Sequence, residues 1–153
     1  MAAAMLLRMS QIADELRERT LRYALRILAF CRQLPDTWDT RELGRQLLRA
    51  GMGVAGNYWS ACRGRSDREF VAKLGVSVDE AGESVLWLTA FMRSGIRNDG
   101  ETRALLGEGE QLRAILSKSH KTAKENRRRR KTRKNQLTNS PTHQFTKSIS
   151  DPP

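Results

Sequence analysis

The chain has 153 residues, a net charge of +11, four Pro and two Cys. Its length suits one domain with a hydrophobic core, and the many Ala, Leu, Arg and Glu residues favour helices. No apolar run is long enough to cross a bilayer, and the start "MAAAMLLRMSQ" has too few apolar residues for a signal peptide. We therefore expect a cytoplasmic protein with reduced thiols and no membrane partner.

The first helix is predicted over about residues 6–33. Apolar side chains recur there at three- and four-residue steps, and Leu21, Leu25 and Leu28 form a second stripe beside them. Two stripes make a wide apolar face, which is typical of a central helix or of a subunit interface. Pro35 ends this helix because the residue before a proline is pushed away from helical angles.

The second helix is predicted over about residues 40–62. Asp39 and Glu42 have the spacing of a capping box at its start, and Gly64 can end it in the left-handed conformation. The positions expected to face inward are Leu43, Leu47, Ala50, Gly51, Val54, Tyr58 and Ala61.

The third helix is predicted over about residues 67–93. Ser66 and Glu69 form a second capping box, and the sequence "SGIRNDG" breaks the helix at its far end. The positions expected to face inward are Phe70, Leu74, Val78, Ala81, Val85, Leu88 and Met92.

The fourth helix is predicted over about residues 99–119, although Gly107 and Gly109 weaken it. Beyond His120 apolar side chains are scarce, so we predict disorder for residues 121–153. Short loops between four helices favour antiparallel neighbours. The predicted fold class is therefore all-α: an up-down-up-down antiparallel four-helix bundle in residues 1–120, followed by a disordered basic tail in residues 121–153.

Asn57 is a polar residue among small and apolar ones in the second helix. A buried amide without a partner costs about 1–3 kcal/mol, so Asn57 needs one. Glu83 in the third helix is a plausible partner. We interpret the two as a structural pair, with a ligand site as the alternative.

Several motifs resemble a known family, the four-helix-bundle proteins first noticed as products of intervening sequences in bacterial 23S rRNA genes. Members carry Arg-Ala-x-x-Ser-Ile-x-x-Asn-Ile-Ala-Glu-Gly, then Ser-x-x-Glu-Phe, then a Glu in the next helix. The matching residues in this chain are in register without a gap: Arg49, Ala50, Asn57, Ser66, Glu69, Phe70 and Glu83. The chain departs from the pattern at Gly53, Ser60 and Ala61, which replace the family's Ser, Glu and Gly.

The resemblance covers about residues 10–118 and implies an up-down four-helix bundle that assembles as a homo-oligomer, a pentamer in similar members. A related branch serves as the accessory protein of diversity-generating retroelements and binds a reverse transcriptase and nucleic acid. The rRNA-associated members have no established biochemical activity, so the resemblance implies a fold and an assembly more than a function.

An enzyme is not expected. A di-iron bundle needs inward Glu-x-x-His pairs, but the chain has only His120 and His143, and it lacks phosphate-loop, Cys-x-x-Cys and nucleophile-elbow motifs. We therefore predict no catalytic residues, no metal site and no cofactor.

The charge points instead to nucleic acid. Residues 117–153 hold 11 Lys and Arg residues but only two acids, whereas the first 116 residues have a net charge of +2. Dense positive charge suits phosphates and predicts binding of RNA or DNA without sequence preference. The candidate binding residues are Lys118, Lys121, Lys124, Arg127, Arg128, Arg129, Arg130, Lys131, Arg133 and Lys134. The alternatives are a tail that meets polyanions only incidentally, and a protein–protein adaptor such as an accessory subunit for a reverse transcriptase.

Overall fold

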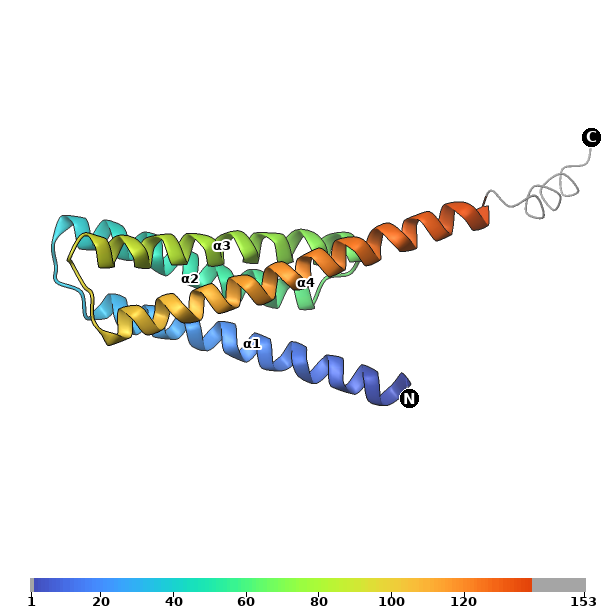
Figure 1. Cartoon of the computed structure of the whole chain (residues 1–153), viewed down its shortest axis with the longest axis horizontal. Helices are drawn as coiled ribbons and strands as arrows, with labels where there is room; N and C mark the ends of the chain where they lie inside the picture. The colour runs from blue at the N-terminus through green and yellow to red at the C-terminus, as the bar shows by residue number, and fades with distance from the viewer. Residues whose placement is uncertain (1, 139–153) are drawn as a thin grey trace, which may run out of the picture.

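Four long helices account for nearly all of the described chain. The structure, a computed structural model, describes residues 2–138, with side chains from Ser10 to Leu137. The helices are α1 (Ala2–Arg32), α2 (Trp38–Cys62), α3 (Asp67–Arg93) and α4 (Gly100–Thr138). Figure 1 shows the α1–α2 and α3–α4 connections at one end of the molecule and the α2–α3 connection at the other. The predicted all-α four-helix bundle is therefore confirmed.

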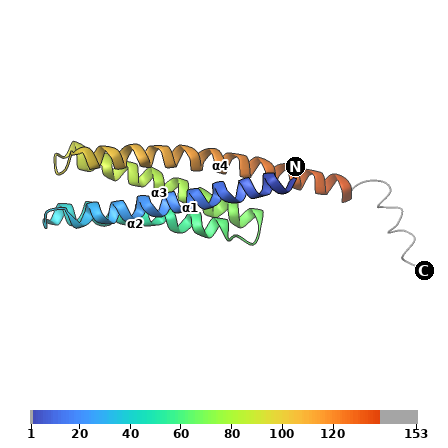
Figure 2. The same ribbon diagram turned by 90° about the horizontal axis from the view of Figure 1, so that it is seen from below.

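The helices pack in sequence order around the bundle, and α4 closes it against α1. Figure 2 shows the same arrangement from below, with the last turns of α4 projecting beyond the other helices. No helix in the described part of the chain combines the length and the apolar character that a membrane span requires.

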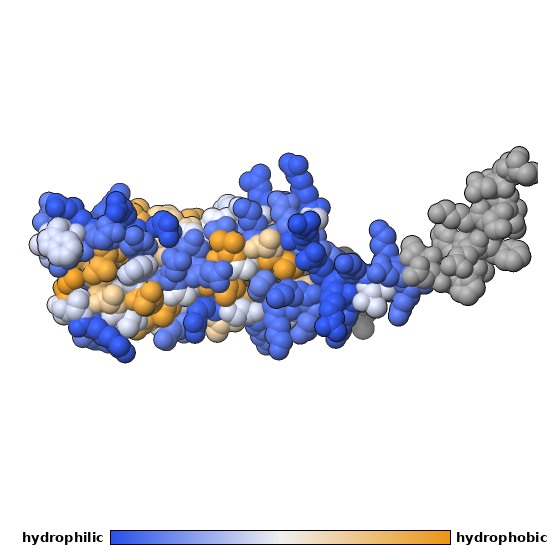
Figure 3. Space-filling model, turned by 90° about the horizontal axis from the view of Figure 1, so that it is seen from above, coloured by the Kyte–Doolittle hydropathy of each residue, from blue (hydrophilic) through white to orange (hydrophobic). Residues whose placement is uncertain are grey.

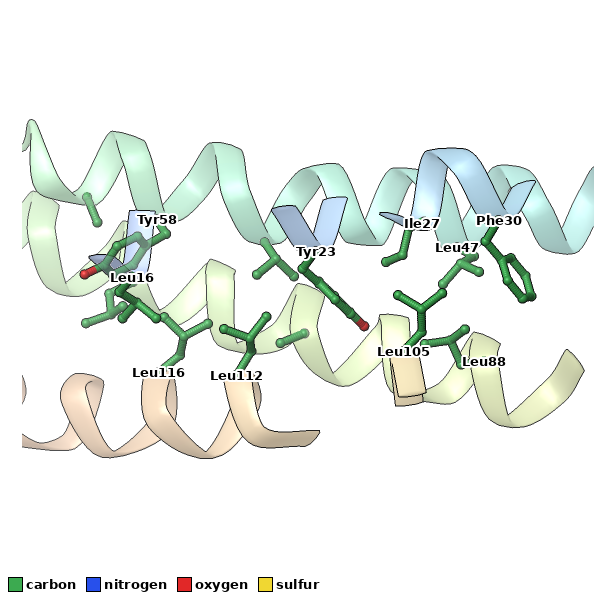
Figure 4. Packing of buried hydrophobic residues seen from close by; sticks show 14 of the residues in the cluster. Leu16, Tyr23, Ile27, Phe30, Leu47, Tyr58, Leu88, Leu105, Leu112 and Leu116 are labelled. Carbon is green, nitrogen blue, oxygen red and sulfur yellow. The ribbon is translucent and has the colours of Figure 1, made fainter. Parts of the chain in front are cut away.

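The core contains large apolar side chains from all four helices (Figure 4). Those with less than 2% exposure are Tyr23, Ile27, Phe30, Leu47, Val54, Leu74, Leu88, Phe91, Leu105, Leu112 and Leu116. Two aromatic rings, Phe30 and Phe91, meet edge to face with centroids 5.4 Å apart. This geometry suits the quadrupoles of both rings and joins the end of α1 to the end of α3.

One buried hydroxyl in this core is paired across helices. Tyr23 Oη on α1 and Ser84 Oγ on α3 lie 2.9 Å apart and share a hydrogen bond. Burial raises the pKa of Tyr23 to about 12, although the bond to Ser84 acts in the opposite direction. The phenol is therefore neutral, and its polar end is satisfied inside the core.

Gly109 lets α4 approach α1 closely at this hydroxyl. A Cβ atom at Gly109 would overlap Tyr23 Oη and would lie 3.1 Å from Val85 Cγ2, whereas nothing lies within 4 Å of the corresponding position at Gly107. The two glycines thus have different roles. Gly109 makes room for a core side chain, and Gly107 faces open space.

Ion pairs fix the position of α4 on α1. Arg19 donates from Nε and Nη2 to the two carboxylate oxygens of Glu108, at 2.7 and 2.8 Å. This bond to Glu108 raises the pKa of Arg19. Two turns closer to the α3–α4 loop, Arg26 Nη2 lies 3.0 Å from Glu101 Oε1.

The loop before α4 is tied down by a second group of contacts. Asp99 Oδ1 accepts from the backbone N–H of Thr102 at 2.8 Å, which places Asp99 at the helix start as a capping residue. This bond, together with the Arg97 side chain 2.8 Å from Asp99 Oδ2, holds the pKa of the carboxyl well below its usual range. The Arg97 guanidinium also lies 4.2 Å from the ring centroid of Phe30.

The helix boundaries differ in detail from those predicted. Thr37 is the N-cap of α2, and its backbone N–H donates to Thr40 Oγ1 at 3.2 Å, so the box predicted at Asp39 and Glu42 is wrong. The box at α3 is confirmed, because Ser66 Oγ accepts from Glu69 N at 3.1 Å.

The left-handed glycine predicted at the end of α2 is also wrong. Within the described residues Gly95, at the end of α3, is the one glycine with positive φ, at 74°. Gly64 instead keeps a negative φ, and its N–H donates to Ala61 O at 2.9 Å.

The inward face of α3 is rotated from the prediction. Val71 and Phe91 are buried, whereas the predicted Phe70, Val78, Val85 and Met92 are half-buried. The small side chains of Ser77 and Ser84 are buried between them, where α3 lies close to α2 and α1. A stripe chosen from apolar residues alone misses these positions.

Candidate nucleic-acid interface

The largest departure from the sequence prediction is the length of α4. Disorder was expected from residue 121, but the helix continues through the Arg-rich run to Thr138. Residues 110–138 contain no Gly or Pro, and Lys, Arg, Glu and Gln are good helix formers. Residues 139–153, which include His143 and Lys147 of the predicted tail, lie outside the described residues.

All ten candidate cations therefore lie on one helix. Each residue from Lys118 to Lys134 in the predicted set is exposed, and Glu125 is the one acidic residue between them. At about 100° per residue, their positions fall on every side of the helix rather than on a single face. Figure 3 shows this end of the molecule covered by hydrophilic residues, whereas hydrophobic residues reach the surface along the bundle.

One of these cations holds α4 to the start of α3. Arg130 Nη1 donates to both carboxylate oxygens of Asp67, at 3.0 and 2.8 Å. Both side chains are exposed, so the contribution of this pair to stability is about 1 kcal/mol or less. The last turns of α4 project past the other helices (Figure 1).

The family-motif residues lie elsewhere, on α2 and α3. Asn57 Nδ2 donates to Gly53 O, one turn back in its own helix, at 2.9 Å. Glu83 Oε2 lies 3.6 Å from Arg49 Nη2 at an exposed position. The predicted Asn57–Glu83 pair is therefore not formed, because each side chain has a nearer partner.

Glu80 is the residue of this face that the sequence prediction missed. Its carboxyl group packs directly over Gly53, where a Cβ atom would clash with Glu80 Cδ. Burial, and next the charge of Glu83, raise the pKa of Glu80. Glu80 Oε2 and Trp87 Nε1 are the buried side-chain polar atoms without a hydrogen-bond partner in the described part of the chain. The signal that could have revealed Glu80 is Gly53, since a glycine at a family Ser position leaves room for a larger side chain.

The other motif residues are structural. Ser66 and Glu69 begin α3, and the Glu69 carboxylate accepts from the Arg65 N–H at 3.0 Å. Phe70 packs half-buried against the core. Among the described residues no group of three or more His, Cys, Asp and Glu side chains could hold a metal ion.

Comparisons with known proteins agree with this architecture. The family model of the 23S rRNA-intervening sequence proteins matches residues 15–118. A protein of unknown function from the S23 ribosomal protein family of Bacteroides thetaiotaomicron VPI-5482, solved by crystallography, superposes with a TM-score of 0.66 at 21% identity. The match covers 71% of this chain and 97% of that one. No curated protein matches the chain significantly.

The family match ends at Lys118, where the basic part of α4 begins. The bundle is thus the part shared with relatives, and the cationic extension lies outside the match. On the strength of the match over residues 15–118, the chain belongs to the 23S rRNA-intervening sequence protein family.

Proposed function

We propose that this protein is a non-enzymatic, oligomeric bundle that binds RNA or DNA without sequence preference through the basic part of α4. The observation that carries the proposal is the row of ten exposed cations from Lys118 to Lys134 with one acid among them. Phosphates are the polyanionic partner that such a row suits, since each neutralised phosphate releases condensed counterions. Much of this row lies beside α3, and only the last turns of α4 extend beyond the bundle.

The surface also supports assembly into a homo-oligomer. Leu25 on α1 is 50% exposed, and Met52 and Trp59 on α2 are 39% and 40% exposed. Two contacts fix how α1 and α2 are aligned, because Arg17 lies beside Trp59 and Ile27 lies beside Gly51. In this alignment Leu25 and Met52 lie at the same height along the two helices. We propose this apolar face as the contact between copies, with the pentamer implied by the family resemblance as the expected state. Several basic helices on one particle would then bind a long nucleic acid with added avidity.

The test is a salt titration of labelled RNA and DNA. The test variant replaces Arg127 to Lys131 with Gln, which keeps helix propensity and removes five charges. The matched control replaces five exposed arginines of the bundle with Gln: Arg41, Arg45, Arg49, Arg93 and Arg103. Both variants lose the same net charge, so a difference between them reports position rather than overall charge.

We expect the α4 variant to lose most of its affinity and the control to keep most of it. The slope of log K against log salt should fall by about 0.9 per lost contact on duplex DNA and by about 0.7 on a single strand. Equal slopes for the α4 variant and the unmodified protein would refute the α4 site. If no form binds nucleic acid, the adaptor hypothesis takes precedence, with a reverse transcriptase as the partner to test.

Assembly is tested separately by light scattering. A Leu25→Glu, Met52→Glu double variant places charges on the proposed contact without touching the buried core. We expect the unmodified chain to form an oligomer and this variant to be smaller, with unchanged helix content. An unmodified chain that is monomeric at micromolar concentration would refute the assembly proposal and leave the α4 proposal standing.

A further inference from the structure

The basic part of α4 borders a groove where it crosses the beginning of α3. This groove, which we call the basic groove, has a volume of about 610 Å³. Val71 and Val78 of α3, with His120 of α4, form its floor. The rim carries five cations and one acid: Lys121, Lys124, Arg127, Arg128, Lys131 and Glu125. Figure 1 shows α4 passing the start of α3 at this level. The volume is within the range of about 300–1,000 Å³ typical of small-molecule sites.

The chemistry of the basic groove differs from that of a charged surface. Val71 is buried and Val78 is half-buried, so the floor is apolar, whereas the rim cations are exposed. A ligand that fills both parts must carry a flat or apolar body next to regularly spaced negative charges. An unpaired nucleotide has both, because its base faces are free and its phosphate is charged. In a duplex the bases are stacked inside, and only phosphates reach the rim.

His120 adds a ring to the floor. The His120 side chain is half-buried. A Cβ atom added to Gly75 would lie only 3.1 Å from His120 Nε2. The absence of a side chain at Gly75 therefore lets the imidazole lie against the α3 backbone. An aromatic ring at the floor can stack on a base of any kind.

The groove has an acidic boundary. The next hollow between α3 and α4, toward the α3–α4 loop, shares Val78 and Ser117 with the basic groove. Its charged lining residues are three acids and one cation: Asp79, Glu83, Glu110 and Arg113. The net charge of these lining residues is negative in the hollow and positive in the basic groove, so a polyanion favours the basic groove. From Ser117 to Lys131 the helix axis rises about 21 Å, at about 1.5 Å per residue. At about 3.4 Å per stacked nucleotide, this length holds about six nucleotides.

From these observations we infer that the basic groove is a binding site for single-stranded nucleic acid, with bases on the valine and histidine floor and phosphates on the cationic rim. This inference rests on the proposed function and narrows it: an unpaired strand of about six nucleotides is bound in preference to a duplex. Sequence preference is not expected, because the floor offers apolar and ring contacts rather than a defined set of hydrogen bonds.

The test measures binding of the full chain to three labelled probes of equal length by fluorescence anisotropy. The probes are a 12-nucleotide oligouridine, a 12-base-pair RNA duplex, and a 12-nucleotide strand with abasic sites throughout, which keeps its phosphates and lacks bases. We expect oligouridine to bind about tenfold or more tighter than the abasic strand, since base stacking on one ring corresponds to about 5- to 150-fold in affinity. Oligouridines of 4, 6, 8 and 12 nucleotides should gain affinity steeply up to about six and slowly thereafter.

Val78→Glu tests the floor, with Val76→Glu as its control. Val76 is 42% exposed on the same helix and does not line the basic groove, so the control carries the same charge change. We expect Val78→Glu to abolish the preference for oligouridine over the abasic strand and Val76→Glu to keep it. Val78→Thr preserves the β-branched shape without adding a charge and should reduce the same preference, and it serves if Val78→Glu does not fold.

The results distinguish failure of this inference from failure of the proposed function. If all three probes bind equally and the Val78 variants match Val76→Glu, the cations act without the groove. In that case the inference fails and the proposed function stands. If none of the probes binds at physiological salt, both fail.

Discussion

Substituting the two α4 glycines with Ala should have opposite effects on stability. Replacing Gly by Ala inside a helix normally stabilises it by about 1 kcal/mol. Gly107→Ala should show this gain, since nothing lies within 4 Å of the new methyl group. Gly109→Ala places the same methyl group against Tyr23 Oη and Val85 Cγ2 in the core.

The expected change in the free energy of unfolding for Gly109→Ala is the sum of two destabilising effects and one stabilising effect. Overpacking a dense core costs about 1–3 kcal/mol. Displacing the Tyr23 hydroxyl from Ser84 leaves a buried polar group unpaired, at about 1–3 kcal/mol. After subtraction of the helix-propensity gain of about 1 kcal/mol, the expected net loss is about 1–5 kcal/mol. At about 2–8 °C per kcal/mol, the Tm should fall by several degrees or more.

The assay is urea and thermal unfolding followed by circular dichroism at one fixed protein concentration, because assembly makes stability concentration-dependent. A double-mutant cycle with Tyr23→Phe isolates the contact. Removing the hydroxyl oxygen leaves Tyr23 Cζ, 3.3 Å from the new methyl position, as the nearest ring atom. The double variant should therefore lose less stability than the two single variants together. If Gly109→Ala stabilises the protein as much as Gly107→Ala does, the inference that α4 packs closely against Tyr23 of α1 at Gly109 is wrong.

Three further measurements test other parts of the structure. Burial raises the pKa of Cys31 to about 11. Its alkylation at pH 8 should therefore be on the order of a hundredfold slower than that of a free thiol of pKa about 8.5, and the rate should rise up to about pH 11. A rate equal to that of glutathione at pH 8 would contradict this prediction. The folded-state pKa of Asp99 is depressed below about 3.9, so its cap stabilises α4 above about pH 4 and is lost as the pH falls further. Asp99→Ala should therefore be less stable than the unmodified chain at pH 7, with a difference that shrinks in acid, and equal Tm values at pH 7 would count against the cap. Glu83→Ala should change the free energy of unfolding by less than about 1 kcal/mol, because its partner Arg49 is exposed, whereas a loss above about 2 kcal/mol would support a buried role for Glu83.

The helices of the bundle could be predicted well because apolar periodicity and capping boxes depend on residues only a few positions apart in the sequence. Apolar periodicity located four helices, and the Ser66–Glu69 spacing located the start of α3. The prediction of disorder from residue 121 is wrong because it considered that segment separately from the helix before it. Scarcity of apolar residues indicates that a segment cannot fold by itself, but α4 is already begun and anchored by the core at Leu105, Leu112 and Leu116. Extending an existing helix avoids the cost of nucleation, so a polar stretch of good helix formers continues it.

Contacts between distant residues were beyond the reach of sequence patterns. Gly109 was interpreted as a weak point of the fourth helix, yet its role depends on Tyr23, which lies in the first helix. The prediction correctly placed Asn57 and Glu83 on neighbouring helices. Which turn of α3 lies nearest to Asn57 depends on how the two helices are aligned along their axes, and the sequence pattern does not specify this alignment. The structure places Glu80, one turn before Glu83, over Gly53. The basic groove likewise needs Val71, Val78 and His120 together, and these come from two helices.

The density of charge on α4 makes this helix a polyelectrolyte in its own right. Between Lys118 and Lys134 the net charge of nine lies along about 24 Å of axis, or about one charge per 2.7 Å, compared with about one per 1.7 Å in duplex DNA. In water, two unit charges repel by about the thermal energy already at about 7 Å. Mobile anions must therefore gather around α4 in solution, as cations gather around nucleic acid. Binding then releases ions of both signs, and the affinity depends on the identity of the anion in the buffer as well as on the ionic strength.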